Sequence, residues 1–396
     1  MPISRNVTRH FAPSRPSGQF LGLLLALPLS LSSGLTSDLY AQDELDPAPD
    51  PTLDPSLDPS MDPIPQDGDD PDVYTFEDSG LSMFDRTRRD GEPPIGIAMS
   101  EENLPAGTSA LRVRLSRTSF DGLGNSRRDV TSAQAFAAGF TVAPTSMTVN
   151  RAEFEYVHGF NERWTIWGVL PVVEKELDAD INGGGTSTSK TSGLGDVRLG
   201  GNYLFHEDES QRVNFSIGVT LPTGEFDGRD TYGAVANALL PYAMQLGGGT
   251  FDILPSAGWV RLQDGWSMGA RAWGRFPIGK NSDDWAISRE FDADFWASRE
   301  LSQELTGTLR LNAQWWGDIQ GNAAGLNLTN SPLEDSGFQG GSRLNLIGGI
   351  IWDLDARTAP AANRLELEIG VPIDQRLDGP ALQREWSLLL GWKLSL

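Results

Sequence analysis

The chain has 396 residues, 39% of them hydrophobic, and a formal net charge of −23 at pH 7. Beyond the N-terminus no stretch approaches the ~20 apolar residues of a transmembrane helix, which excludes a helical membrane protein. The acidic balance argues against nucleic acid as a partner, and the absence of cysteine removes disulfides, thiolate nucleophiles and cysteine zinc sites.

The first 41 residues have the organisation of a cleaved secretory signal peptide. Three arginines precede an apolar core at 20–31, and Ala41 provides a small residue at the cleavage position. A membrane anchor is the alternative, but Pro28 and several serines interrupt a segment already too short to span. Removing residues 1–41 would take the formal net charge from −23 to −25, because the three arginines and Asp38 are lost.

Residues 42–72 predict an acidic, disordered linker. Between positions 43 and 72 lie eleven acidic residues, eight prolines and no basic residue. Such a segment buries too little apolar surface to offset the entropy of ordering it. Contact with calcium or with the cell wall is the functional alternative to a plain tether. Residues 73–109 are less biased, and we expect a short adaptor or plug whose structure the sequence does not define.

From residue 110 to 396 the chain divides into twelve stretches in which apolar and polar residues alternate, the pattern of strands with one apolar face. Strands are expected at 110–119, 148–158, 163–173, 195–205, 211–221, 250–260, 265–277, 288–299, 304–316, 342–354, 363–373 and 385–396.

The strand lengths and connections are typical of a transmembrane β-barrel. About ten residues tilted by roughly 40° cross an outer-membrane apolar band about 25 Å tall. Short connections alternate with long ones at 120–147, 174–194, 222–249 and 317–341. Bacterial barrels place short turns in the periplasm and long loops outside, so an even strand count predicts both termini in the periplasm.

Charges on the polar parity predict the register of three hairpins. Residues that oppose each other in an antiparallel pair share one index sum, and opposite charges so placed contribute roughly 0.2–1 kcal/mol each. The matching pairs are Arg112 with Glu155, Arg114 with Glu153, Arg271 with Asp294, Arg275 with Glu290, and Glu366 with Lys393. A soluble β-sandwich also alternates. The signal peptide, the loop rhythm and the intact last strand favour an all-β, antiparallel barrel of about 12 strands.

Short clusters at the predicted strand ends resemble a family of outer-membrane barrels named after the meta-pathway of phenol degradation. The pieces are Gly193–Gly200 (GLGDVRLG), Leu221–Gly224 (LPTG), Ala143–Met147 (APTSM), Leu240–Tyr242 (LPY), Gln314–Gly317 (QWWG) and Leu377–Pro380 (LDGP), spread over about 105–396. The resemblance implies a β-barrel with a role in passing small molecules across the outer membrane. Related sequences are richer in His and Met, and this chain has no such cluster.

The polar parity supplies the candidate lumen-lining residues, whose charges either pair to fill the lumen or orient a solute. They are Arg112, Arg114, Glu153, Glu155, Trp167, Arg198, Arg271, Trp273, Arg275, Glu290, Asp292, Asp294, Arg310, Trp316, Glu366 and Lys393, with Arg151, Arg343, Trp296 and Glu368 on the same parity. Twelve strands enclose more space than a side-chain-filled barrel of eight and much less than a sixteen-strand porin, which predicts a narrow or partly occluded lumen. Trp164, Trp259, Trp266, Trp315 and Trp386 are expected at the lipid interfaces.

Catalytic and metal chemistry are not expected, and no cofactor is implied. Only His158 and His206 follow the signal segment, with no spacing that pairs them with a nucleophile. The Asp67–Asp72 run lacks the glycine and glutamate positions of a calcium loop. The sequence predicts a passive outer-membrane channel or carrier for small, hydrophobic or aromatic solutes, in contact with membrane lipid and of undefined oligomeric state. A non-conducting structural or adhesion barrel is the alternative.

Overall fold

A computed structural model describes residues 93–97, 103–263, 265–354 and 363–396. The predicted signal peptide (1–41), the acidic linker (42–72) and most of the predicted adaptor lie outside the described residues. The chain separates into two units, Met1–Val73 and Tyr74–Leu396, and every described residue belongs to the second unit.

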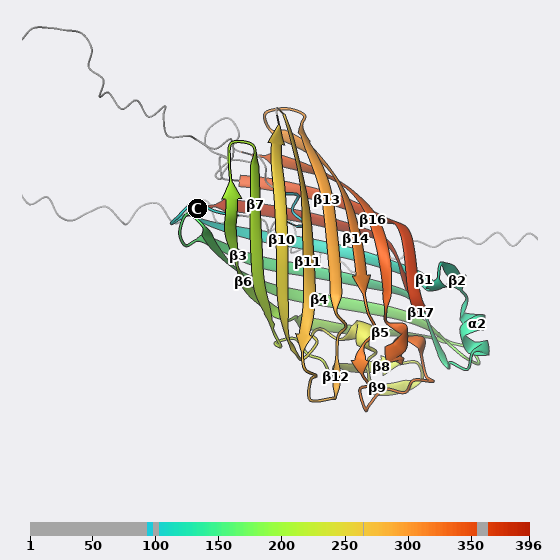
Figure 1. Cartoon of the computed structure of the whole chain (residues 1–396). Helices are drawn as coiled ribbons and strands as arrows, with labels where there is room; N and C mark the ends of the chain where they lie inside the picture. The colour runs from blue at the N-terminus through green and yellow to red at the C-terminus, as the bar shows by residue number, and fades with distance from the viewer. Residues whose placement is uncertain (1–92, 98–102, 264, 355–362) are drawn as a thin grey trace, which may run out of the picture. The chain divides into compact units, whose positions relative to one another are not determined.

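Eleven antiparallel strands, each paired with its neighbours, close into a barrel when β17 pairs with β1 (Figure 1). They are β1 (Ser109–Ser126), β3 (Val142–Gly159), β4 (Trp164–Ile181), β6 (Val197–Glu207), β7 (Gln211–Leu221), β10 (Phe251–Gln263), β11 (Trp266–Ile278), β13 (Glu290–Glu300), β14 (Leu305–Trp316), β16 (Gly341–Asp353) and β17 (Asn363–Ser395). In the described part of the chain, no helix is long and apolar enough to cross a membrane.

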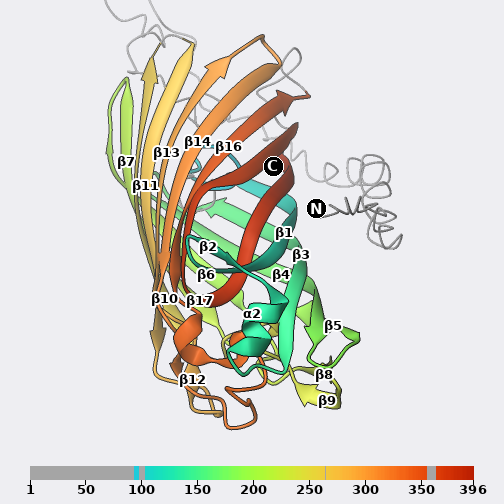
Figure 2. The ribbon, with the colours of Figure 1, turned by 90° about the vertical axis from the view of Figure 1, so that its right-hand side faces the viewer.

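The long element β17 makes two passes, so the barrel wall has twelve. Its first half pairs with β16 up to Leu377, and from Leu377 to Ser395 it pairs, with irregularities, with β1. Figure 2 shows β17 as one ribbon that turns back on itself. Gln375 joins the two halves: its Nε2 donates to the backbone oxygen of Arg384 at 2.7 Å, and its Oε1 accepts from the Arg384 amide at 3.0 Å.

Two ends of the barrel differ in their connections. At the turn end, 160–163, 208–210 and 301–304 join neighbouring strands. At the loop end, the connections hold β2 (Arg128–Val130), α2 (Ser132–Ala137), β5 (Thr186–Leu194), β8 (Arg229–Tyr232), β9 (Val235–Leu239), η2 (Tyr242–Met244), β12 (Trp285–Ala286), β15 (Gln320–Gly321), η3 (Pro332–Glu334) and η4 (Ser336–Phe338). Figures 1 and 2 show β5, β8, β9, β12 and α2 gathered at this end.

All twelve predicted strands are present, and the predicted register is confirmed in two of the three hairpins, whereas the pairing of Glu366 with Lys393 stays a prediction. Arg112 opposes Glu155, Arg114 opposes Glu153, Arg271 opposes Asp294 and Arg275 opposes Glu290. Two of the predicted long loops are wrong in part, because β1, β3, β4 and β5 extend well into 120–147 and 174–194. On the outward parity of β4, apolar residues end at Val172, and Glu174, Glu176, Asp178 and Asp180 follow. The strand therefore continues after the apolar face that revealed it has ended.

The polar parity faces inward and the apolar parity outward, which distinguishes this barrel from a sandwich. On β7, Arg212, Asn214 and Ser216 are buried, whereas Phe215 and Ile217 are exposed. A soluble sandwich would hide the apolar residues. Large exposed apolar residues recur around the wall, including Leu170, Leu199, Val219, Phe295, Leu309, Ile350 and Ile369. The wall thus presents an apolar surface of the kind that outer-membrane barrels expose to lipid.

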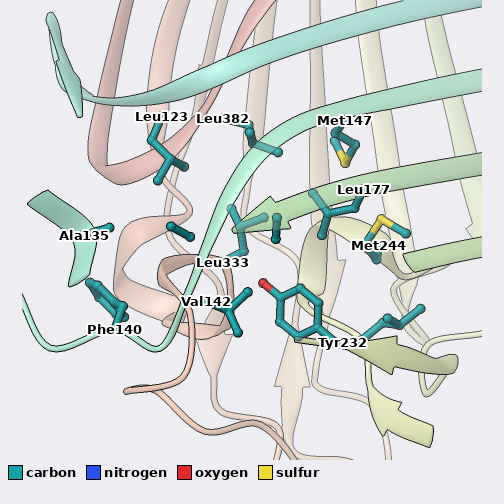
Figure 3. Close-up of a cluster of buried hydrophobic side chains, with 13 residues drawn as sticks. Leu123, Ala135, Phe140, Val142, Met147, Leu177, Tyr232, Met244, Leu333 and Leu382 are labelled. Atoms are coloured by element: carbon teal, nitrogen blue, oxygen red, sulfur yellow. The ribbon is translucent and has the colours of Figure 1, made fainter. Parts of the chain in front are cut away.

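At the loop end, buried residues of the connections and of β1, β3, β4 and β17 form a hydrophobic cluster, here called the cap cluster (Figure 3). It consists of Leu123, Ala135, Phe140, Val142, Ala143, Met147, Leu177, Ala179, Tyr232, Leu240, Met244, Leu333 and Leu382. Tyr232 Oη and Ser331 Oγ lie 2.6 Å apart, which ties the 222–250 connection to the 317–340 connection. Within the cap, α2 begins with a capping box in which Thr131 and Gln134 satisfy each other's backbone amides.

Candidate functional site in the barrel lumen

Two of the family-like motifs, Gly193–Gly200 (GLGDVRLG) and Leu221–Gly224 (LPTG), are hydrogen-bonded to each other between the end of β5 and the start of β6. The Asp196 carboxylate accepts the backbone amides of Gly224 and Gly248, each at 2.9 Å. Thr223 Oγ1 donates to the Gly195 oxygen and accepts the Val197 amide, also at 2.9 Å. The GLGD and LPTG pieces are thus partners in one clamp, which fixes the 222–250 connection against the barrel rim.

Two tryptophans lie flat against the inner wall because glycines leave room for them. A Cβ at Gly200 or Gly218 would collide with the Trp167 ring, and one at Gly269 would collide with Trp296. The Trp167 Nε1 donates to Asn202 Oδ1 at 3.0 Å. Both rings are buried. Of the two roles considered for these tryptophans, filling the lumen wall and stacking against a solute, the structure therefore favours filling.

An ion-pair network crosses the middle of the lumen, and its first half belongs to β1, β3 and β6. Arg112 Nη1 lies 2.8 Å from Glu155 Oε2, and Arg114 Nη2 lies 2.8 Å from Glu153 Oε2. Arg114 also contacts Glu155, and Arg198 contacts Glu153. Each carboxylate therefore binds two arginines.

The second half belongs to β11, β13, β14 and β17. Arg310 bridges two strands, with Nη1 2.9 Å from Asp294 Oδ1 and Nη2 2.7 Å from Glu368 Oε2. Arg271 Nη2 lies 2.6 Å from Asp294 Oδ2 and 3.5 Å from Asp292 Oδ1. The two halves together, here called the mid-lumen network, hold five arginines and five carboxylates, so their formal charges cancel.

The segment Pro93–Ile97 passes between the two halves of this network. Arg114 Nη1 donates to the Ile95 backbone oxygen at 3.1 Å on one side. On the other side Gly96 lies against Arg310 and Glu368 so closely that a Cβ would collide with both. Ile97 packs with Val260, Leu262 and Trp296, and Ile95 and Ile97 are at most 1% exposed. This part of the predicted adaptor, residues 93–97, is therefore an occupant of the lumen.

Three cavities lead from the loop end to this segment. An outer one of about 240 Å³ is lined by Tyr242, Ile319 and Gln339, among others. It shares Arg275 and Glu290 with a cavity of about 490 Å³, here called the loop-end cavity. The loop-end cavity shares Trp273 and Glu290 with a deeper one of about 280 Å³, whose lining includes Gly96 and Ile97. Neighbouring cavities thus share lining residues, and the deepest of the three reaches Gly96 and Ile97.

The predicted lumen residues fall into two overlapping groups. The mid-lumen network contains Arg112, Arg114, Glu153, Glu155, Arg198, Arg271, Asp292, Asp294 and Arg310, whereas Trp273, Arg275, Glu290 and Trp316 line the cavities without belonging to it. Glu153 and Arg198 also line the loop-end cavity, and Arg114, Arg271 and Asp292 line the deeper one. Glu366 and Lys393 are buried. The ion pair expected between Arg275 and Glu290 is wrong, although the two residues oppose each other as predicted. Arg275 Nε instead lies 2.7 Å from Asp252 Oδ2.

Several cavity residues were not among the candidates. Lys175 lies in β4 and Arg384 in β17, both within stretches that were expected to be loops. Asp196 and Asp252 fall within the predicted strands 195–205 and 250–260, and Asp196 shares the parity of Arg198, so the same parity was an available signal for both. Arg151 shares the polar parity, and that parity was the available signal for it.

Neither histidine belongs to a recognisable catalytic or metal site. His158 Nδ1 lies 2.9 Å from Ser109 Oγ at the turn end, a contact that spacing did not predict. His206 Nε2 lies 3.2 Å from Asp208 Oδ2 in a turn. A catalytic serine–histidine pair needs a third group that orients the imidazole, and among the described residues no carboxylate contacts His158. Within the same residues, no group of three or more His, Asp or Glu side chains could hold a metal ion.

The fold and the inward-facing polar parity define the class, an outer-membrane β-barrel. Residues 127–359, more than half of the chain, match the family described as "Putative MetA-pathway of phenol degradation", and the chain belongs to that family.

Among solved structures, an outer membrane channel from Pseudomonas putida F1 superposes with a TM-score of 0.51 at 15% identity, covering 74% of this chain and 97% of that one. The Pseudomonas putida toluene transporter TodX has 10% identity and a TM-score of 0.37, over 80% and 98% of the two chains. A Pseudomonas aeruginosa FadL homologue has 9% identity and a TM-score of 0.37, over 77% and 95%. The first establishes the shared fold, and scores at the level of the other two carry no argument. No curated protein matches the chain.

Proposed function

We propose that this protein is an outer-membrane channel that admits small solutes through its lumen. The observation that carries the proposal is the series of three cavities that share lining residues from the loop end to Gly96 and Ile97. A barrel that served only as a rigid anchor would gain stability by filling this space, because voids forfeit packing contacts.

In this proposal the loop end faces the outside and the turn end faces the periplasm, as the connection lengths favour. A solute enters between the η2 connection, at Tyr242, and the opposite connection, at Ile319. It then occupies the loop-end cavity, where Trp273 and Leu254 offer apolar surface. Small hydrophobic or aromatic solutes fit such a lining. Passage onward requires Pro93–Ile97 to leave its place between Arg114 and Arg310.

A non-conducting structural barrel is the second candidate, and one observation favours it. The mid-lumen network is neutral and closely paired, and Pro93–Ile97 fills the space between its halves. If the lumen is closed in this way, the cap cluster and the outer connections are the parts of the protein that would make contacts with a partner.

Conductance separates the two candidates. We expect the chain without residues 1–41, purified as a folded barrel and placed in planar bilayers, to give discrete current steps, and to accelerate the swelling of liposomes in solutions of small solutes. Liposomes containing the heat-unfolded protein are the control. Absence of both current steps and solute-dependent swelling would contradict the channel and support the structural barrel.

A further inference from the structure

The loop-end cavity is positively charged in a strongly acidic protein. Its lining contains five cations, Arg151, Lys175, Arg198, Arg275 and Arg384, and three carboxylates, Glu153, Asp196 and Glu290. The formal charge of the lining is therefore +2, whereas the whole chain carries −23. A cleft lined by one sign of charge concentrates ligands of the opposite sign.

Two of the three carboxylates are already engaged in holding the fold. Glu153 binds Arg114 and Arg198 in the mid-lumen network. Asp196 accepts the amides of Gly224 and Gly248 in the motif clamp. Glu290 is the third lining carboxylate and lies near Arg384, as does the buried Asp292, while Asp196 also lies near Lys175.

Three cations, Arg151, Lys175 and Arg384, are correspondingly under-compensated. The Lys175 ammonium donates to two neutral acceptors, the backbone oxygens of Ala243 at 2.9 Å and Gln245 at 2.5 Å. Because an ammonium has three donors, one stays available among the described residues. The hydrogen bond from Arg384 Nη1 to Gln314 Oε1 is long, at 3.4 Å, and the buried Nε of Arg384 has no hydrogen-bond partner among the described residues. Arg151 has Glu153 as its nearest carboxylate, at 3.8 Å, and shares it with two other arginines.

These three cations belong to one place. All line the loop-end cavity, and Arg151 lies within electrostatic range of both Lys175 and Arg384. Trp273 lines the same cavity and the deeper one, beside Leu254. An arginine fork and a lysine ammonium suit the two oxygens of a carboxylate, and an indole ring offers apolar surface to the body of the same ligand.

We propose that the loop-end cavity binds a small organic anion, with its carboxylate at Arg151, Lys175 and Arg384 and its hydrophobic body against Trp273. A volume of about 490 Å³ falls within the range of small-molecule sites. The site rests on the proposed channel function, whose solute class it specifies. Its test measures binding at equilibrium, so that the two proposals can fail separately.

The test is titration calorimetry of the folded full barrel in detergent at low ionic strength, with benzoate as the probe and acetate, benzyl alcohol and benzylamine as comparisons. We expect benzoate to bind and the other three to bind at least about tenfold more weakly. Acetate lacks the aromatic ring, benzyl alcohol lacks the charge, and benzylamine carries a positive charge instead of a negative one. Lys175→Met and Arg151→Met should each weaken benzoate binding about tenfold, or 1.4 kcal/mol. Lys190→Met is the matched control, since Lys190 is exposed on β5 and paired with Glu176 at 3.0 Å.

Glu290→Gln distinguishes loss of the binding site from loss of folding. Removing the charge of this lining carboxylate, which competes with a bound anion for the cavity cations, should tighten benzoate binding severalfold, and misfolding cannot produce a gain. Benzylamine or benzyl alcohol binding as well as benzoate, an unchanged affinity in Lys175→Met, or a weaker one in Glu290→Gln would each overturn the site. Conductance without benzoate binding contradicts the anion site alone, whereas benzoate binding without conductance supports the site and contradicts the channel.

Discussion

The mid-lumen network and the loop-end cavity are built from the same kinds of residue on the same inward parity, yet they differ in balance. The network matches five arginines with five carboxylates and has Pro93–Ile97 threaded through it. The cavity has two more cations than carboxylates and about 490 Å³ of space. Inward-facing charge alone therefore does not indicate whether a lumen is filled or open.

Stoichiometry explains the difference. A buried charge is tolerated when it is paired and hydrogen-bonded, and pairing at one-to-one draws the side chains together into a closed network. An excess of one sign keeps side chains apart and leaves hydrogen-bonding capacity unused. We expect perturbations of the network to change closure and stability, and perturbations of the cavity to change what is bound.

The largest effect is expected from expelling Pro93–Ile97. Gly96→Phe places a side chain where a Cβ already collides with Arg310 and Glu368, so the segment should leave the lumen and single-channel conductance should rise several-fold. Gly348→Phe is the control, because a Cβ there meets nothing and the position faces outward. The chain has no cysteine, so Ile97→Cys should react faster with an impermeant maleimide when combined with Gly96→Phe. Equal conductance in both phenylalanine variants would show that the segment does not close the path.

Breaking the network should cost stability next. Arg310→Met leaves Asp294 and Glu368 without their shared partner, and loss of one member of a buried ion pair typically costs about 3–5 kcal/mol. Unfolding in urea, followed by the heat-modifiable migration of the barrel, measures the change. Arg127→Met is the comparison, since Arg127 pairs with Asp374 on the exposed surface, where solvent screens the interaction and little stability is lost. Similar losses for both variants would remove the distinction between network and surface.

A charge-reversal test addresses the border of the two regions. Arg275→Glu should destabilise the barrel by about 1–3 kcal/mol, because Asp252 is buried and loses its partner at 2.7 Å. Adding Asp252→Arg should restore part of the loss in a double-mutant cycle, whereas adding Glu290→Arg should not. Rescue by Glu290→Arg would mean that register alone determines the pairing.

That case marks how far the sequence could predict the structure. The two-residue period of strands and the requirement for an apolar outer face revealed the twelve passes and the register. They did not give the partner of Arg275. Asp252 of β10 opposes Pro277 of β11, two residues from Arg275, so Arg275 reaches a diagonal neighbour on β10. It does not pair with Glu290, the residue directly across on β13.

The cavity was harder to predict, for two physical reasons. Beyond Val172 the outer face of β4 becomes acidic, so the alternation that would have marked Lys175 as inward-facing ends too early. Pro93–Ile97 has no periodic pattern at all. Its position depends on Arg114, Arg310 and Trp296, and the last two lie about two hundred residues further along the chain, so no local signal predicts it.

The smallest expected effect concerns the cap, whose stability should depend on pH through one buried carboxylate. Glu334 is buried in η3 and accepts hydrogen bonds from the Asn327 amide at 2.8 Å and from Asn330 Nδ2. Burial raises the pKa of its carboxyl above the ordinary 4.5, against the opposing effect of these hydrogen bonds. A raised pKa means that the folded cap favours the neutral acid. Its contribution is fully present below the unfolded pKa and is lost as pH rises through the folded one.

Hydrogen exchange of the 323–338 amides, corrected for intrinsic pH dependence, should therefore show more frequent opening as pH rises through this range. Glu334→Gln fixes a neutral side chain and should flatten the dependence. Opening that instead increases as pH falls would mean that the hydrogen bonds from Asn327 and Asn330 outweigh burial, and that the cap favours the charged carboxylate.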